Sequence, residues 1–160
     1  MRIHFASDHA GYEYKNELLE FVANELGYEV VDDGAYELDM ADDYPDFVHK
    51  TATAVSNDPA NTRGIILGGS GQGEAITANR HSGVRAVVYY GEPAKEQVDA
   101  SGAELNMITS TRMHNDANVL SIGARFISID EAKRVVWEWL GTDFVGGERH
   151  DRRIAKIEEF

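Results

Sequence analysis

A glycine-rich loop is the feature of this sequence best suited to chemistry. Residues 68–73 are Gly-Gly-Ser-Gly-Gln-Gly, so four glycines fall within six positions directly after the apolar run 64–67. Glycines let backbone N–H groups turn toward a ligand oxygen, and a helix that starts behind the loop adds its positive end. The spacing matches neither a Walker A loop nor a dinucleotide fingerprint. We favour anion or oxyanion binding over a bare strand-to-helix turn, because a bare turn rarely needs so many glycines.

An acidic residue, Glu74, follows the loop where the next helix is expected to begin. An acidic side chain in a first helical turn is often there only to complement the helix dipole. Beside an oxyanion-binding loop, however, an ionised carboxylate is also what abstraction of a proton from carbon requires. Glu74 is therefore a candidate general base.

Two further polar segments could move protons. Asp8 and His9 follow the first apolar run, 3–6, and His114 with Asn115 precedes the run 119–122. Asp8 could instead cap the first helix, and His114 alone is an ordinary loop histidine. Because ligands of open α/β sheets bind beyond the carboxyl ends of the strands, we expect these segments to gather there with the glycine loop.

A cluster of basic residues stands out near the end of an acidic chain. Arg149 and Arg153 are four residues apart, so on a helix they share a face and can converge on one phosphate, with Arg125 as a third member. The alternative is a solvated helix whose arginines pair with neighbouring glutamates, namely Glu148, Glu158 and Glu159. We favour phosphate binding, because a phosphate ligand needs a local cationic pocket in a chain this acidic.

Short apolar runs alternate with helical patterns along the chain. The runs 3–6, 28–31, 64–67, 84–89 and 119–122 are expected strands. Helices are expected from about 11 to 26, 45 to 55, 74 to 80, 128 to 140 and 150 to 158, the fourth opened by a capping box of Ser128 and Glu131. The segment 93–98 also looks helical, whereas 99–111 shows no clear period. This alternation predicts one α/β domain over residues 1–160, with a five-stranded parallel sheet covered on both faces and a C-terminal helical tail from about residue 148.

Composition narrows the function further. The 160 residues carry a formal net charge of -13, which argues against a nucleic-acid or anionic-membrane surface. Cysteine is absent, so disulfides and thiolate chemistry are excluded. No metal site is expected, because His4, His49 and His81 are scattered and no helical His pair occurs. With neither a leader nor an apolar run long enough to span a membrane, the protein is expected to be cytoplasmic.

Taken together and in order, these motifs resemble ribose-5-phosphate isomerase type B, of the ribose/galactose isomerase family. The resemblance covers nearly the whole chain, and it also rests on 43–45 (Asp-Tyr-Pro), 78–80 (Ala-Asn-Arg) and 123–125 (Gly-Ala-Arg). It implies a Rossmann-like (flavodoxin-like) three-layer fold, no cofactor, no metal, and a homodimer or tetramer whose active sites are shared between chains.

The resemblance also implies roles for single residues. Asp8 and His114 would open the furanose ring. Many members place a catalytic cysteine at the position of Gly68, but a subgroup without it uses the glutamate at the end of the glycine loop. Glu74 would then move a proton between C2 and C1 through a cis-enediolate. The oxyanion would be held by Ser70 and by the amides of Gly69, Gly71 and Gly73.

The phosphate, by the same resemblance, would be held by Arg125, Arg149 and Arg153 with help from His9 and His150, and Tyr44 and Asn115 would line the sugar site. The stretch 91–113 is longer than the corresponding family segment, which leaves a six-carbon substrate such as allose or galactose 6-phosphate open. A non-catalytic phosphate or nucleotide sensor is the other alternative. Binding alone, however, needs no base, and all three proton-transfer residues are present.

Overall fold

The computed structural model describes residues 1–95, 97–98, 102 and 104–159. Within these residues the strands are β1 (Arg2–Ser7), β2 (Glu29–Asp32), β3 (Thr62–Gly68), β4 (Ala86–Tyr89) and β5 (Val119–Gly123). The helices are α1 (Tyr12–Asn24), α2 (Pro45–Asn57), α3 (Gln72–Ala78), α4 (Met107–Asn115), α5 (Ile129–Leu140) and α6 (Glu148–Ile157). None of these helices is long and apolar enough to cross a membrane.

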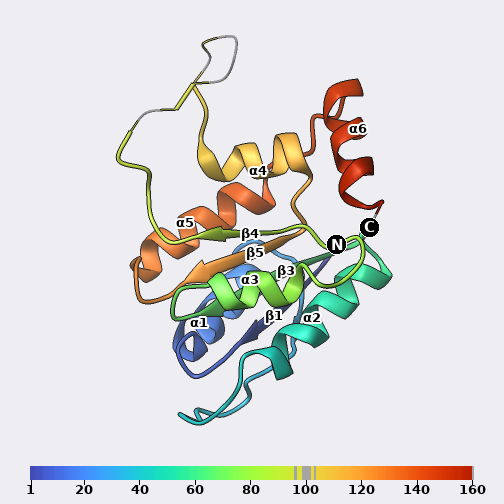
Figure 1. Ribbon diagram of the computed structural model, residues 1–160. Coiled ribbons are helices and arrows are strands. Elements are labelled where there is room, and N and C mark those ends of the chain that lie inside the picture. The colour runs from blue at the N-terminus through green and yellow to red at the C-terminus, as the bar shows by residue number, and fades with distance from the viewer. Residues whose placement is uncertain (96, 99–101, 103, 160) are drawn as a thin grey trace.

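The strands form a parallel sheet in the order β2-β1-β3-β5-β4 (Figure 1). After β1 the chain moves to one side of the sheet to form β2, and it then returns to the other side to form β3. The direction of winding therefore reverses between β1 and β3. In open parallel sheets a ligand crevice opens at such a reversal, outside the carboxyl ends of the strands.

Helices cover both faces of the sheet and bury its apolar side chains (Figure 1). On one face α1, α4 and α5 contribute buried side chains such as Leu18, Ile108 and Trp139 to the larger core. On the other face α2 and α3 contribute Val48 and Ala78 to a smaller core. The predicted three-layer α/β fold with a five-stranded parallel sheet is confirmed.

The structure corrects the sequence prediction between β4 and β5. The described residues of the segment 93–98 form no helix, and Val98 instead pairs with Glu104 in an isolated antiparallel bridge. The helix lies later, at α4, where the Asn106 side chain accepts hydrogen bonds from the amides of Ile108 and Thr109. Only two residues of α4 are buried, so its apolar period is too weak to recognise. The rest of the unassigned stretch, 99–101 and 103, lies outside the described residues.

Smaller differences concern helix starts. α3 begins at Gln72 rather than Glu74, and α6 at Glu148 rather than His150. Ser128 caps α5 by accepting from the Glu131 amide at 3.2 Å, as expected, but the Glu131 carboxylate accepts from the Tyr89 hydroxyl at 2.6 Å. The capping box is therefore only half formed, because its second member stabilises β4 instead.

A buried hydroxyl on β5 fixes the glycine loop to the sheet. The Oγ of Ser121, a fully buried residue, donates to the Gly71 carbonyl at 2.6 Å. Gly71 has a φ of 75°, a left-handed conformation that places the start of α3. Loop and sheet are thus joined by one side chain.

We predict that Ser121→Ala lowers the free energy of unfolding by about 0.5–1.5 kcal/mol, because the buried Gly71 carbonyl loses one of its two donors and keeps only the Ala75 amide at 3.1 Å. Urea unfolding followed by circular dichroism measures the loss. Ser56→Ala is the matched control, since Ser56 donates to the Ser82 carbonyl in an exposed position. An equal loss in the two variants would contradict the role assigned to Ser121.

Candidate active site

A pocket of about 500 Å³ opens where β1 and β3 end, at the reversal in winding. Asp8 follows β1 directly, and the glycine loop follows β3. The lining residues come from these two segments, the 33–44 loop, α3 and the turn after β5; they are Asp8, His9, Ala10, Tyr44, Gly69, Ser70, Gly73, Glu74, Arg125 and Phe126. Eight of the residues expected in the site therefore lie around one cavity.

Glu74 is a buried carboxylic acid in the first turn of α3, with only 4% of its surface exposed. Its carboxyl group occupies the space that a side chain at position 68 would need, since a Cβ built on Gly68 would overlap both carboxylate oxygens. Burial raises the pKa of the Glu74 carboxyl, its own backbone N–H opposes the shift, and the charge of Asp8 adds to it. A raised pKa suits a group that must both take up and release a proton.

The glycine loop presents free backbone donors to this pocket. Among the described residues, the N–H groups of Gly69, Gly71 and Gly73 donate to no acceptor. The loop is held from behind, where the Gly68 and Gly69 carbonyls accept from the amides of Ala124 and Arg125 at 2.9 and 3.2 Å. Gly71 does not line the cavity; it shapes the loop. This arrangement can stabilise an oxyanion without rearranging.

Tyr44 enters the pocket over the glycine loop. A Cβ built on Gly73 would lie 2.6 Å from the Tyr44 hydroxyl, so this approach requires glycine at position 73. Tyr44 is also the residue just before α2, whose Pro45 occupies the first helical position. The beginning of α2 thereby positions an aromatic hydroxyl in the pocket.

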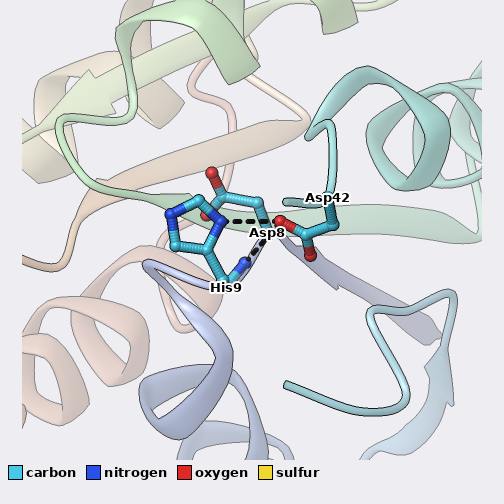
Figure 2. Close-up of side chains that lie close together, drawn as sticks. All are labelled: Asp8, His9 and Asp42. Carbon is cyan, nitrogen blue, oxygen red and sulfur yellow. Dashed lines mark hydrogen bonds and ion pairs between the residues drawn. The ribbon is translucent and has the colours of Figure 1, made fainter. Parts of the chain in front are cut away.

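Asp8 and His9 project from the turn after β1. Asp8 does not cap α1, whose N-cap is Gly11; its Oδ1 instead accepts from the Ala10 amide at 2.9 Å. His9 hydrogen-bonds Asp42 through both its amide and its ring (Figure 2). Sequence reasoning missed Asp42. Asp42 is one of several acidic residues in the 33–44 loop. Only the fold brings it to His9, which lies 33 residues earlier in the sequence.

The same three side chains are the grouping in the described part of the chain that comes nearest to a metal site. One potential ligand atom from each of Asp8, His9 and Asp42 lies within 4.8 Å of the others (Figure 2). A carboxylate pair with one imidazole would suit a divalent transition metal. In this structure, however, the Asp42 Oδ1 and His9 Nδ1 atoms hydrogen-bond each other at 2.7 Å.

Arg125 supplies positive charge to the pocket. A Cβ built on Gly69 would lie 3.2 Å from its guanidinium, which places the group against the glycine loop. No carboxylate of the described residues lies within 4.0 Å of it. An arginine without a protein partner at the edge of a cavity is well suited to bind a phosphate.

The other expected residues lie at the opposite end of the sheet. Since β5 begins at Val119, His114 and Asn115 at the end of α4 lie near the amino ends of the strands, not the carboxyl ends as expected. Glu158, just past α6, pairs with Arg85 next to the start of β4 at 2.9 Å, which places α6 at the same end (Figure 1). One chain therefore does not bring His114 or α6 to its own pocket.

At that end, α4 and α6 form a second cluster. The rings of His114 and His150 stack, with centroids 4.8 Å apart and an interplanar angle of 4°. Arg149 and Arg153 lie on α6 with no carboxylate of the described residues within 4.0 Å. The nearest glutamates pair elsewhere: Glu148 with Arg152, and Glu158 with Arg85. The alternative interpretation, in which Arg149 and Arg153 pair with Glu148, Glu158 and Glu159, therefore has no ion pair to support it among the described residues.

A buried carboxylate, a glycine loop and an arginine with no carboxylate partner among the described residues lie together at the reversal point of a parallel sheet, an arrangement that suits proton transfer on a small anionic substrate. Comparison with known proteins gives the family. The sequence model of the Ribose/Galactose Isomerase family matches residues 3–157. The chain belongs to this family, as its motifs indicated.

Individual relatives match over 90% or more of their own length. Ribose-5-phosphate isomerase B of Mycobacterium leprae is 36% identical over 160 residues, which is all of this chain and 90% of the relative. The crystal structure of ribose-5-phosphate isomerase B from Mycoplasma genitalium with bound ribulose-5-phosphate has a TM-score of 0.86 at 34% identity, covering 98% of this chain and 93% of that one. The Clostridium thermocellum enzyme has a TM-score of 0.85 at 39% identity, with coverages of 99% and 96%.

We predict that Glu74→Gln raises the melting temperature at pH 7.5. Because the folded-state pKa of Glu74 is raised, the folded protein holds this proton more tightly than the unfolded chain does. Stability is therefore lost as pH rises from the unfolded to the folded pKa, and a neutral side chain avoids that loss. Scanning calorimetry at several pH values measures the difference.

The gain from Glu74→Gln should disappear in acid, below the ordinary pKa of glutamate, where the wild-type carboxyl is also neutral. Glu37→Gln is the control, because Glu37 is exposed. A lower melting temperature for Glu74→Gln at pH 7.5 would contradict the cost of burial assigned to the carboxylate.

Proposed function

We propose that this protein is an aldose-ketose isomerase that interconverts ribose 5-phosphate and ribulose 5-phosphate. The observation that carries the proposal is the buried Glu74 carboxylate, which occupies the side-chain space of Gly68 beside the free amides of the glycine loop. A base of raised pKa next to an oxyanion site is what proton abstraction beside a carbonyl needs. The bound ribulose-5-phosphate of the Mycoplasma genitalium relative supports the five-carbon substrate.

Isomerisation moves one proton between carbons and one between oxygens. After Asp8 and His114 shift a proton from the anomeric hydroxyl to the ring oxygen, the open aldose offers its C2 proton to Glu74. The resulting cis-enediolate is held by Ser70 and the amides of Gly69 and Gly73, which line the cavity, and Ser70 relays the proton from O2 to O1. Glu74 then returns its proton to C1, which gives the ketose and restores the carboxylate.

Substrate binding follows from the charges around the pocket. Arg125 and His9 line the cavity and can hold the phosphate with two positive groups. Tyr44 lies over the sugar. Arg149, Arg153 and His150 complete the phosphate site in this proposal, and Asn115 completes the sugar site. A charged sugar phosphate does not cross a membrane unaided, which supports the cytoplasmic location expected from the sequence.

A second copy of the chain would supply the residues at the far end of the sheet. His114, Asn115 and the basic face of α6 lie at the amino ends of the strands, whereas Glu74 lies at the carboxyl ends. In a twofold dimer, each copy can present this far cluster to the pocket of the other. We therefore propose a homodimer, or a tetramer of such dimers, with two shared sites in each dimer.

We predict that purified wild-type protein in EDTA converts ribose 5-phosphate to ribulose 5-phosphate, and that Glu74→Gln lowers kcat by about 10²–10⁴-fold, the usual contribution of a general base. A coupled assay of the ketose product measures both rates. Turnover that survives Glu74→Gln would overturn the base, and chelator-sensitive turnover would overturn the metal-free mechanism. Turnover of only six-carbon sugar phosphates would overturn the substrate.

We also predict that two inactive variants restore each other. When Glu74→Gln and His114→Ala chains associate at random, half of the dimers are mixed, and each mixed dimer has one site with neither lesion. About a quarter of the wild-type rate should return. Co-expression of Glu74→Gln with Asp8→Asn is the control, because both lesions lie in the same pocket and no intact site can form. Recovery in the control, or none in the test pair, would contradict shared sites.

A further inference from the structure

One carboxylate outside the expected site holds the pocket histidine in place. The Oδ1 atom of Asp42 accepts from the His9 amide at 3.1 Å and lies 2.7 Å from the ring Nδ1 (Figure 2). Two bonds to one oxygen fix both the backbone and the ring of His9. The second ring nitrogen of His9, Nε2, then lies on the side of the ring away from Asp42 and has no hydrogen-bond partner among the described residues, so that a protonated ring can donate from it to a ligand (Figure 2).

Asp42 is itself presented by a short turn. Its amide donates to the Asp39 carbonyl at 3.2 Å, and the Asp39 side chain accepts from the Ala41 amide at 2.9 Å. Only 8% of the Asp42 side chain is exposed, and its second oxygen, Oδ2, is buried with no hydrogen-bond partner among the described residues. A buried carboxylate is costly unless a positive charge compensates it, and His9 is the partner it has here.

The charges that face His9 come from each segment around the pocket. Asp42 of the 33–44 loop and Asp8 after β1 favour the protonated ring, whereas Arg125 after β5 and partial burial oppose it. Glu74 of α3 is a further acid lining the same cavity. The hydrogen bond to Asp42 is the largest influence, and the net result is a raised pKa of His9.

We propose that Asp42 is a positioning residue, which keeps His9 as an oriented imidazolium that binds the substrate phosphate together with Arg125. The inference rests on the proposed sugar-phosphate isomerase function and adds a residue to it. Asp42 touches neither the sugar nor the reacting carbons; it acts through His9. Its effect therefore falls on substrate binding and on the pH range in which binding is tight, not on the proton transfer at C2.

The test compares Asp42→Asn with Asp43→Asn. Both variants remove one negative charge from the same loop, but the Asp43 side chain is exposed and makes no bond to His9 among the described residues. Asparagine at position 42 can still accept from His9, so the fold is retained while the charge is lost. KM and kcat for ribose 5-phosphate are measured from pH 6 to pH 9.

In the wild type KM stays low until His9 loses its proton. In Asp42→Asn the increase of KM with pH should begin at lower pH, because His9 loses its proton earlier. Between the His9 pKa values of the two proteins, the KM of Asp42→Asn should be at least about threefold above wild type. The kcat should stay within about twofold of wild type. As the pH falls below the His9 pKa of both proteins, the KM values should converge to within about twofold. Asp43→Asn should follow the wild-type curve.

Two further measurements separate positioning from a merely structural role. The pKa of His9, followed by the NMR shifts of its ring nitrogens and assigned with His9→Gln, should fall in Asp42→Asn. The double variant His9→Gln/Asp42→Asn should have the same KM as His9→Gln alone, because Asp42 then has nothing to act through. A KM profile of Asp42→Asn that superimposes on wild type, or losses that add in the double variant, would overturn the inference.

Failure of the proposed function is distinguishable from failure of the inference. Wild-type protein that turns over no sugar phosphate would overturn the isomerase, and the phosphate-binding part of the inference would fall with it. An unchanged His9 pKa in Asp42→Asn would overturn the coupling between Asp42 and His9 in either case.

Discussion

The arrangement of this protein depends on placing one carboxylate, that of Glu74, in a nearly dry space at the end of β3. That space exists because position 68 has no side chain. Its walls are set by the pairing of β3 with β5, by the left-handed turn at Gly71, and by the Ser121 hydroxyl that holds this turn to the sheet. If Glu74 is the proposed base, burying it at this cost has a use, because a solvated carboxylate would be a weaker base toward carbon. The contacts that fix the glycine loop to the sheet therefore also fix the position of the Glu74 carboxylate.

The elements that sequence could predict are those whose signal is local. β1 and β3 each contain a short, mostly apolar run, the glycine loop has four glycines within six residues, and Ser128 lies three residues before the amide that it caps. Glu74 was found for the same reason, since loop and acid are adjacent. α4 was missed because it buries only two side chains and is defined by its Asn106 cap. Asp42 was missed because its role depends on a contact with His9 that forms only in the folded protein. The sequence also did not predict at which end of the sheet His114 lies. That placement follows from the topology, because a residue that precedes a strand lies at the amino end of that strand.

The distribution of charge is consistent with a proposed phosphate site that uses residues from both ends of the sheet. A chain of net charge -13 must gather cations locally to hold a phosphate dianion. One pocket provides Arg125 and His9, and α6 carries Arg149 and Arg153 at the far end. Keeping the two basic clusters apart within one chain limits their mutual repulsion in the monomer. In the proposed twofold dimer, bringing the two clusters together would concentrate positive charge only where an anion compensates it.

The shared volume of Gly68 and Glu74 also constrains how such a site can change over generations. A side chain at position 68 and the carboxyl group of residue 74 compete for the same atoms of space, so a thiol on the strand and a carboxylate from the helix cannot both occupy the base position. An ancestor with cysteine at 68 could carry a glutamate at 74 only if that glutamate pointed elsewhere. Replacing the cysteine by glycine would then delete one base and, in the same substitution, open the space into which the other turns. A side chain at position 68 and the carboxyl group of residue 74 are therefore alternative occupants of the same space. In a chain that already carries glutamate at 74, one substitution at position 68 could exchange them.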